Sequence, residues 1–271
     1  MLRTSSHIGS ITLLLLMTGC ASVPETRLPD VADDKPLVLV SQEQGKSVSK
    51  YVDGKLLPEI TDVGLPNAEL TSPREQKEIS EAQLALISNQ LNRSLCNRLG
   101  DYFPLVGNAA PESLRLEFRL TGITPTSKAL SGVSAALGVF VPGPFRLPIG
   151  MGAIALDGES LLGDKTVTFL RWAKGANPVF NGAKVSTIGD AYDLVDSFAK
   201  DFTALLVQPP GDAPKRSKLD QSQIEKNELL CLQNFGEVGL AQKGASFLLP
   251  LSPESIDGGK PQADPGSPEK R

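Results

Sequence analysis

Three cysteines carry the most specific chemistry in this 271-residue sequence, which also contains a single histidine, His7. Cys20 ends a short apolar N-terminal segment, whereas Cys96 and Cys231 lie far apart in the body of the chain. A cysteine sulfur can carry a lipid or form a disulfide with a second cysteine. Because His7 lies in a segment that we expect to be removed, the mature protein lacks a histidine base or ligand, which excludes His-based catalysis and His-bearing metal sites.

The first 19 residues have the pattern of a secretory signal peptide. Arg3 supplies a positive charge, and the apolar run Ile11–Met17 follows it. That run is much shorter than the ~20 apolar residues that a membrane-spanning helix needs. The ending Met-Thr-Gly-Cys resembles the bacterial lipobox, and this resemblance implies cleavage before Cys20 and lipid attachment to it. The alternative is an ordinary signal peptide followed by a chance cysteine.

Acyl chains on Cys20 would tether the protein to a membrane without any protein span, because even two chains anchor a protein stably. Ala21 and Ser22 follow the cysteine where an Asp would favour retention in the inner membrane. By this resemblance we expect the periplasmic face of the outer membrane, with the membrane itself as a partner through the N-terminal lipid.

Cys96 and Cys231 remain as an even pair once Cys20 is lipidated. An oxidising compartment favours a bond between them. Cys96 lies beside an apolar helical stripe that ends at Leu99, and Cys231 shares one face of a predicted helix with Phe235. A disulfide would hold this late helix against the domain; the alternative is two separate buried thiols.

Hydrophobic periodicity and turn residues predict the elements that position these cysteines. Leu114–Leu120 alternates between apolar and polar residues, which indicates a strand with one packed face. Gly163-Asp164 suits a two-residue hairpin turn. We expect strands at Pro36–Val40, Tyr51–Val63, Tyr102–Val106, Leu114–Leu120, Gly152–Leu162 and Lys165–Ala173, and helices from Ser72 to Leu99, Ser186 to Val207 and Leu219 to Phe235.

These elements predict an α+β fold: an antiparallel sheet of four to five strands, two long helices packed on one face, a C-terminal helix and a disordered tail. Pro and charged residues predict a flexible tether before the domain, and Pro, Gly and Ser predict disorder at the end. The expected organisation is a signal peptide (1–19), a tether (20–49), the α+β domain (50–208), a helical extension (209–249) and a disordered tail (250–271).

Three other features invite functional interpretations. Arg115, Glu117 and Arg119 form a charged row that a solvated sheet face explains. The acids Asp190, Asp193 and Asp196 lack the alternate spacing of a calcium loop, and the first turns of a helix favour them through the helix dipole, so we expect no metal there. The uncharged, apolar segment at 129–148 is a buried helix or crossover, or else an insertion that touches lipid, a ligand or another protein.

Composition and motifs disfavour most enzyme classes. The formal net charge is −4, which gives no reason to expect nucleic-acid binding. The sequence contains no dinucleotide-binding glycine motif, no Walker loop, no Gly-x-Ser-x-Gly and no Cys-x-x-Cys. We therefore expect no catalytic residues, no metal and no cofactor.

The region from about Lys50 to Val207 resembles the bacterial lipoproteins of domain-of-unknown-function family 3313. The lipobox at Cys20, the Leu114–Thr121 strand, the segment Ala153–Lys165 and the helix Gly189–Ala199 carry this resemblance. It brings no catalytic residues, and its layout is similar to that of envelope lipoproteins that act as assembly or transport accessories. We expect a non-catalytic accessory that binds another envelope protein or a lipid; the alternatives are a periplasmic carrier of a hydrophobic ligand and a His-free hydrolase.

Overall fold

The computed structural model describes residues 36–43, 46–71, 78–127, 151–176, 185–237 and 252–257. Their elements, in chain order, are β1 (Val38–Glu43), β2 (Lys46–Val52), the 3₁₀ turn η1 (Leu57–Glu59), β3 (Val63–Gly64), α1 (Glu81–Gly100), β4 (Leu105–Val106), β5 (Arg115–Thr124), β6 (Ala153–Leu162), β7 (Lys165–Gly175), α3 (Gly189–Val207), α4 (Gln221–Phe235) and α6 (Pro253–Ile256).

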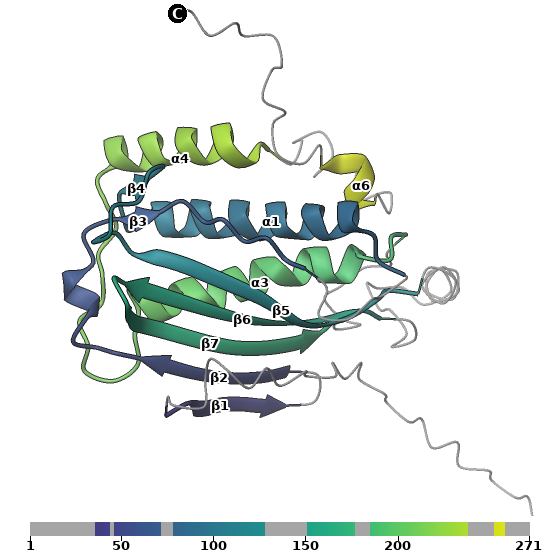
Figure 1. Ribbon diagram of the computed structural model, residues 1–271, viewed down its shortest axis with the longest axis horizontal. Helices are drawn as coiled ribbons and strands as arrows, with labels where there is room; N and C mark the ends of the chain where they lie inside the picture. The colour runs from purple at the N-terminus through teal and green to yellow at the C-terminus, as the bar shows by residue number, and fades with distance from the viewer. Residues whose placement is uncertain are drawn as a thin grey trace, which may run out of the picture.

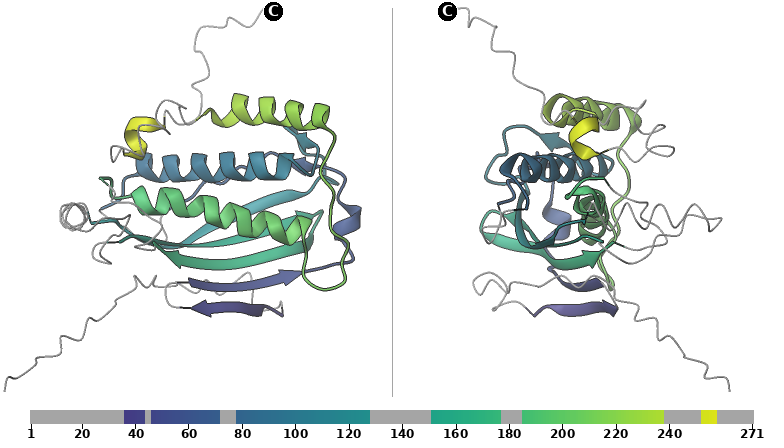
Figure 2. Two further views of the ribbon diagram at one scale, coloured as in Figure 1. Left: turned by 180° about the vertical axis from the view of Figure 1, so that it is seen from behind. Right: turned by 90° about the vertical axis from the view of Figure 1, so that its right-hand side faces the viewer.

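A five-stranded antiparallel sheet, in the order β1-β2-β7-β6-β5, forms one layer of the fold. Helices α1 and α3 pack on one face of it, and α4 lies on the side of α1 away from the sheet (Figures 1 and 2). This arrangement confirms the predicted α+β class with its antiparallel sheet and additional C-terminal helix. β3 and β4 form a separate short parallel pair.

Aromatic side chains join α3 to the sheet. The Phe198 ring lies 5.9 Å from that of Phe118 on β5 and 5.8 Å from that of Trp172 on β7, both edge to face. Gly158 on β6 leaves room for these rings, because a Cβ there would lie 2.8 Å from Phe198. The predicted stripe on α1 is buried in the same core; it comprises Leu84, Ile87, Leu91, Leu95 and Leu99.

The β6–β7 hairpin has the predicted two-residue loop. Leu162 pairs with Lys165, so Gly163 and Asp164 make the turn. Gly163 has a φ of +59°, a conformation that glycine adopts without steric cost. The expected strand Tyr51–Val63, in contrast, is wrong: η1 interrupts it at Pro58, whose missing N–H cannot join a ladder.

Two predicted boundaries also differ from the structure. Helix α1 begins at Glu81 rather than near Ser72, which lies outside the described residues; Ser80 and Gln83 form a capping box that fixes the start. The tether predicted for 20–49 is too long, because β1 and β2 begin within it and pair with the sheet. At the helix, the prediction started too early because Ser72 also suits a cap. At the tether, Pro and charged residues made the predicted flexible segment too long.

The predicted tail (250–271) contains an ordered piece. Pro253–Ile256 forms the one-turn helix α6, and the Asp257 side chain is fully buried. Cys20 and the apolar segment 129–148 lie outside the described residues. None of the helices in the described part of the chain is both long and apolar enough to span a bilayer.

Candidate functional site

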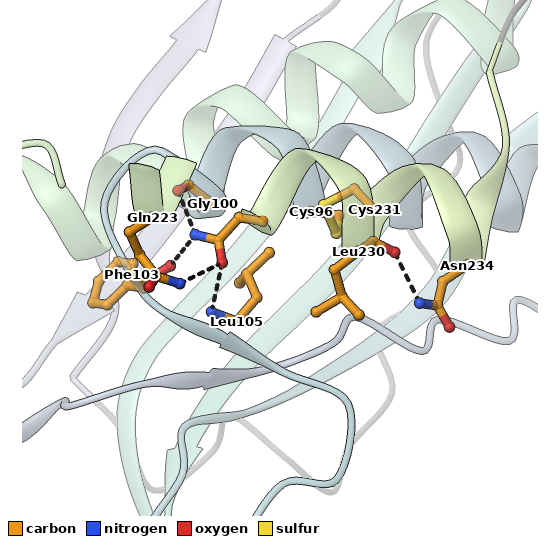
Figure 3. Close-up of a disulfide and its surroundings, with 9 residues drawn as sticks. Cys96, Gly100, Phe103, Leu105, Gln223, Leu230, Cys231 and Asn234 are labelled. Carbon is orange, nitrogen blue, oxygen red and sulfur yellow. Dashed lines mark hydrogen bonds between the residues drawn. A yellow bond between two sulfur atoms is a disulfide. The ribbon is translucent and has the colours of Figure 1, made fainter. Parts of the chain in front are cut away.

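A disulfide joins Cys96 on α1 to Cys231 on α4 (Figure 3). Their Cα atoms are 5.8 Å apart, 135 positions separate them in sequence, and both residues are buried. Each cysteine lies on the helix face that the sequence predicted. The bond therefore ties the C-terminal extension covalently to the first long helix.

Asn227 makes a second attachment, one helical turn before the disulfide. Its amide nitrogen donates to the carbonyl oxygens of Gly100 and Phe103, at 2.7 and 2.9 Å. Its amide oxygen accepts from the backbone N–H of Leu105 at 3.1 Å (Figure 3). Because Asn227 is buried, these bonds satisfy backbone groups at the α1–β4 turn that would otherwise lose water without gaining a partner.

A buried charged cluster, missed by sequence reasoning, lies at the other end of α4. The guanidinium of Arg93 on α1 donates to the carboxylate of Asp257 and to the carbonyl oxygen of Phe235. The Tyr192 hydroxyl on α3 also donates to Asp257, at 2.5 Å. Burial and this hydrogen bond to Asp257 raise the pKa of Tyr192 above its ordinary value. The cluster fixes α6 and the end of α4 against α1 and α3.

A groove of about 970 Å³ lies between α1, α3 and α4, beside this cluster. Its two arginines, Arg93 and Arg98, each contact an aspartate: Arg93 contacts Asp257, and Arg98 contacts Asp196 at 2.8 Å. Further lining carboxylates make the groove acidic; they are Asp193, Glu225, Glu228 and Glu237. Two leucines of α4, Leu229 and Leu232, also line it and are 59% and 40% exposed.

The acids of α3 do not act together. Asp190 is buried; it accepts hydrogen bonds from the Gly152 N–H at 2.7 Å and from the Thr126 hydroxyl at 3.0 Å. Asp196 instead faces Arg98. No group of three His, Cys, Asp or Glu side chains among the described residues is arranged to hold a metal ion.

The charged row on β5 is a solvated face with paired charges. Arg115 contacts Glu117 at 3.2 Å, Arg119 contacts it at 4.0 Å, and all three side chains are exposed. Arg115 and Glu117 need no ligand to explain them. The helical layer rather than this row brings the predicted cysteines together and provides the groove of about 970 Å³.

The sequence offered weak signals for the residues that it missed. Asn227 lies four positions before Cys231 and eight before Phe235, and residues at this spacing lie on one face of a helix. Asp257 gave no such signal, because a stretch rich in Pro and Gly follows it and its partner Arg93 is 164 positions away. Its burial depends on tertiary contacts alone.

Comparisons with known proteins give a family and a distant structural likeness. No curated protein matches the sequence. The chain is similar in structure to the PelC dodecamer from Paraburkholderia phytofirmans, with 11% identity, 60% of this chain and 98% of that chain covered, and a TM-score of 0.34, which is too low to support an argument. Residues 31–202, more than half of the chain, match the profile of a protein family of unknown function. The chain therefore belongs to the DUF3313 family.

Proposed function

We propose that this protein is a lipid-anchored, non-catalytic accessory of the cell envelope that binds another protein through the groove between α1, α3 and α4. The observation that carries the proposal is the combination of exposed leucines and carboxylates in a groove of about 970 Å³. Leu229 and Leu232 are three positions apart on α4 and thus neighbours on its surface. An apolar strip flanked by acids favours a partner segment with apolar and basic side chains.

The way in which α4 is held supports a role in binding. The family match ends at residue 202, so α4 lies beyond it. A disulfide and a buried amide nevertheless fix α4 on α1 while leaving its leucines exposed. A rigidly held helix that presents apolar side chains loses little conformational entropy when it binds a partner.

The proposed location has two supports. The lipobox-like sequence at Cys20 favours lipidation, and a disulfide is typical of compartments outside the reducing cytosol. Replacing Cys20 by Ala should release the protein from membranes into the soluble fraction, measured by cell fractionation and immunoblotting. Retention of the Cys20→Ala variant in the membrane would contradict the anchor.

Site-specific photo-crosslinking in intact cells tests the groove. A photoreactive residue in place of Leu229 should give a discrete crosslinked band that Glu228→Lys weakens, because that change reverses a charge in the groove. The same photoreactive residue at Lys165, an exposed position in the β6–β7 hairpin, is the matched control. Equal crosslinking at both positions, or none at Leu229, would refute binding through the groove.

A further inference from the structure

A second groove, of opposite charge, lies at the sheet edge far from α4. It has a volume of about 320 Å³ and lies between β2 and the C-terminal half of α3. Apolar and basic side chains share its walls; among them are Val40, Lys46, Val48, Lys50 and Leu205. Figures 1 and 2 show β1 and β2 on the opposite side of the molecule from α4.

Lysines outnumber acids around this groove. Lys46 and Lys50 lie on β2, and Lys46 is 3.5 Å from Asp201 of α3. Lys174, opposite Lys46 in the β2–β7 register, and Lys200 are close enough to influence each other electrostatically. Asp201 also accepts a hydrogen bond from the Trp172 indole at 2.9 Å, so its carboxylate contacts both this indole and Lys46. Lys46 and Lys50 thus line the groove together with Asp201, and Lys174 and Lys200 lie nearby.

Lys174 lies among other charges at this edge. Burial is the main reason that the pKa of Lys174 lies below its ordinary value; Lys46 and Lys200 lower it further, and Asp201 opposes them. A nearby anion would offset this repulsion. The positive charge of this surface therefore favours the binding of negative groups.

The neighbouring edge strand is apolar and exposed. Val38, Leu39 and Val40 of β1 are 63%, 55% and 50% exposed. Val38 pairs with Lys50, so an apolar and a basic side chain lie side by side on the same face of the sheet. Apolar side chains next to lysines are the combination that favours an anionic membrane surface, where aliphatic groups enter the interface and lysines meet phosphates.

The position of β1 in the chain connects this surface to the membrane. Val38 follows Cys20 by only 18 positions in the sequence. At ~3.3–3.6 Å per residue, even a fully extended segment of that length spans roughly 60 Å. A lipid on Cys20 would therefore hold the β1 edge within about 60 Å of the bilayer, and the exposed side chains of this edge decide whether it contacts the membrane.

We propose that the Val38–Val40 edge and the four lysines form a membrane-contact surface that binds the phosphate groups of anionic phospholipids. This inference rests on the lipid anchoring proposed above and adds an orientation to it. The β1–β2 edge faces the bilayer, and the acidic groove beside α4 faces away from it, toward a protein partner. Lysine at an anionic surface contributes enough free energy to change occupancy about fivefold per residue.

Lysine acetylation followed by mass spectrometry tests this orientation with the lipidated protein in vesicles. We compare phosphatidylcholine vesicles with vesicles that also contain phosphatidylglycerol. Acetylation of Lys50 and Lys200 should slow about fivefold in the anionic vesicles. Lys165 and Lys226, which are exposed on the hairpin and on α4, serve as internal controls and should react at unchanged rates. High salt should abolish the protection.

A pair of double variants tests the cause of the contact. Lys50→Gln/Lys200→Gln should remove most of the added hydrogen-exchange protection of residues 38–43 in anionic vesicles, whereas Lys165→Gln/Lys226→Gln should keep it. Among the described residues, neither Lys50 nor Lys200 makes a salt bridge, so the fold should tolerate the change; circular dichroism checks this.

Equal acetylation of Lys50 in the two kinds of vesicle would overturn the inference. Protection of β1 that persists in phosphatidylcholine alone and rises with protein density would also overturn it, since it would indicate a second copy pairing with the open strand edge. Failure of the anchor gives a different result: the Cys20→Ala variant then stays in the membrane even in high salt, which removes binding through the lysines. The two proposals can therefore fail separately.

Discussion

Helices α3 and α4 are both amphipathic, with 19 and 15 residues, but different interactions hold them in place. α3 buries a broad apolar face against the sheet, including Val195, Phe198 and Phe202. α4 buries Asn227, Cys231 and Phe235 and leaves Leu229 and Leu232 exposed. α3 contributes a broad face to the core, whereas α4 contributes only Cys231 and Phe235 and is held in addition by a covalent bond and polar contacts.

This difference separates the part of the chain that makes the fold from the part that presents a surface. Apolar burial on α3 is cooperative with the sheet, because the same rings contact β5 and β7. The attachments of α4 each involve one or two residues, so they can be removed one at a time. Three variants test the comparison, in order of decreasing expected effect.

Phe198→Ala should destabilise the whole domain. It removes a fully buried ring between Phe118, Trp172 and Phe202, and Phe→Ala changes in cores cost about 3–5 kcal/mol. Urea denaturation followed by tryptophan fluorescence measures the loss, since Trp172 packs against this ring. Leu229→Ala, on the exposed face of α4, should change stability by less than ~0.5 kcal/mol. Similar losses of unfolding free energy for Phe198→Ala and Leu229→Ala would contradict the difference between α3 and α4.

Removal of the disulfide should release α4 while α3 stays folded. Cys96→Ala with Cys231→Ala lifts a constraint on a loop of 135 positions, and loss of a native disulfide costs about 2–4 kcal/mol. Hydrogen exchange should therefore speed up across Gln221–Phe235 far more than across Gly189–Val207. The wild-type protein in a reducing agent is the matched comparison. Uniform acceleration in both helices would show that α4 is part of the core.

Asn227→Ala should have a smaller effect, confined to the start of α4 and the turn after α1. The change leaves the Leu105 N–H and two carbonyl oxygens without the side chain that contacts them, at a cost of about 1–3 kcal/mol. Asn234→Ala is the control in the same helix, because its amide contacts only the carbonyl oxygen of Leu230 in an exposed position. Thermal melts that give the same midpoint for both variants would contradict the role of Asn227.

Much of this fold could be predicted because its elements follow local rules. The stripe from Leu84 to Leu99 and the alternation in Leu114–Leu120 depend on residues within a few positions of one another, and the structure buries both sets. Gly163-Asp164 could be predicted for the same reason. The start of α1 could not be placed, because Ser72 and Ser80 are both acceptable caps and the choice between them is made by the Ser80–Gln83 capping box.

The sequence by itself determined the number and positions of the cysteines, the apolar faces of the helices and strands, and the absence of histidine beyond residue 7. Tertiary structure alone decided which charges are buried and which gather at the surface. Asp190 accepts a hydrogen bond from Gly152, Asp257 pairs with Arg93, and lysines of β2 and β7 lie near Lys200 of α3. The physical reason is range: helix and strand periodicity is set by neighbours, whereas the environment of a charge is set by whatever the fold brings beside it.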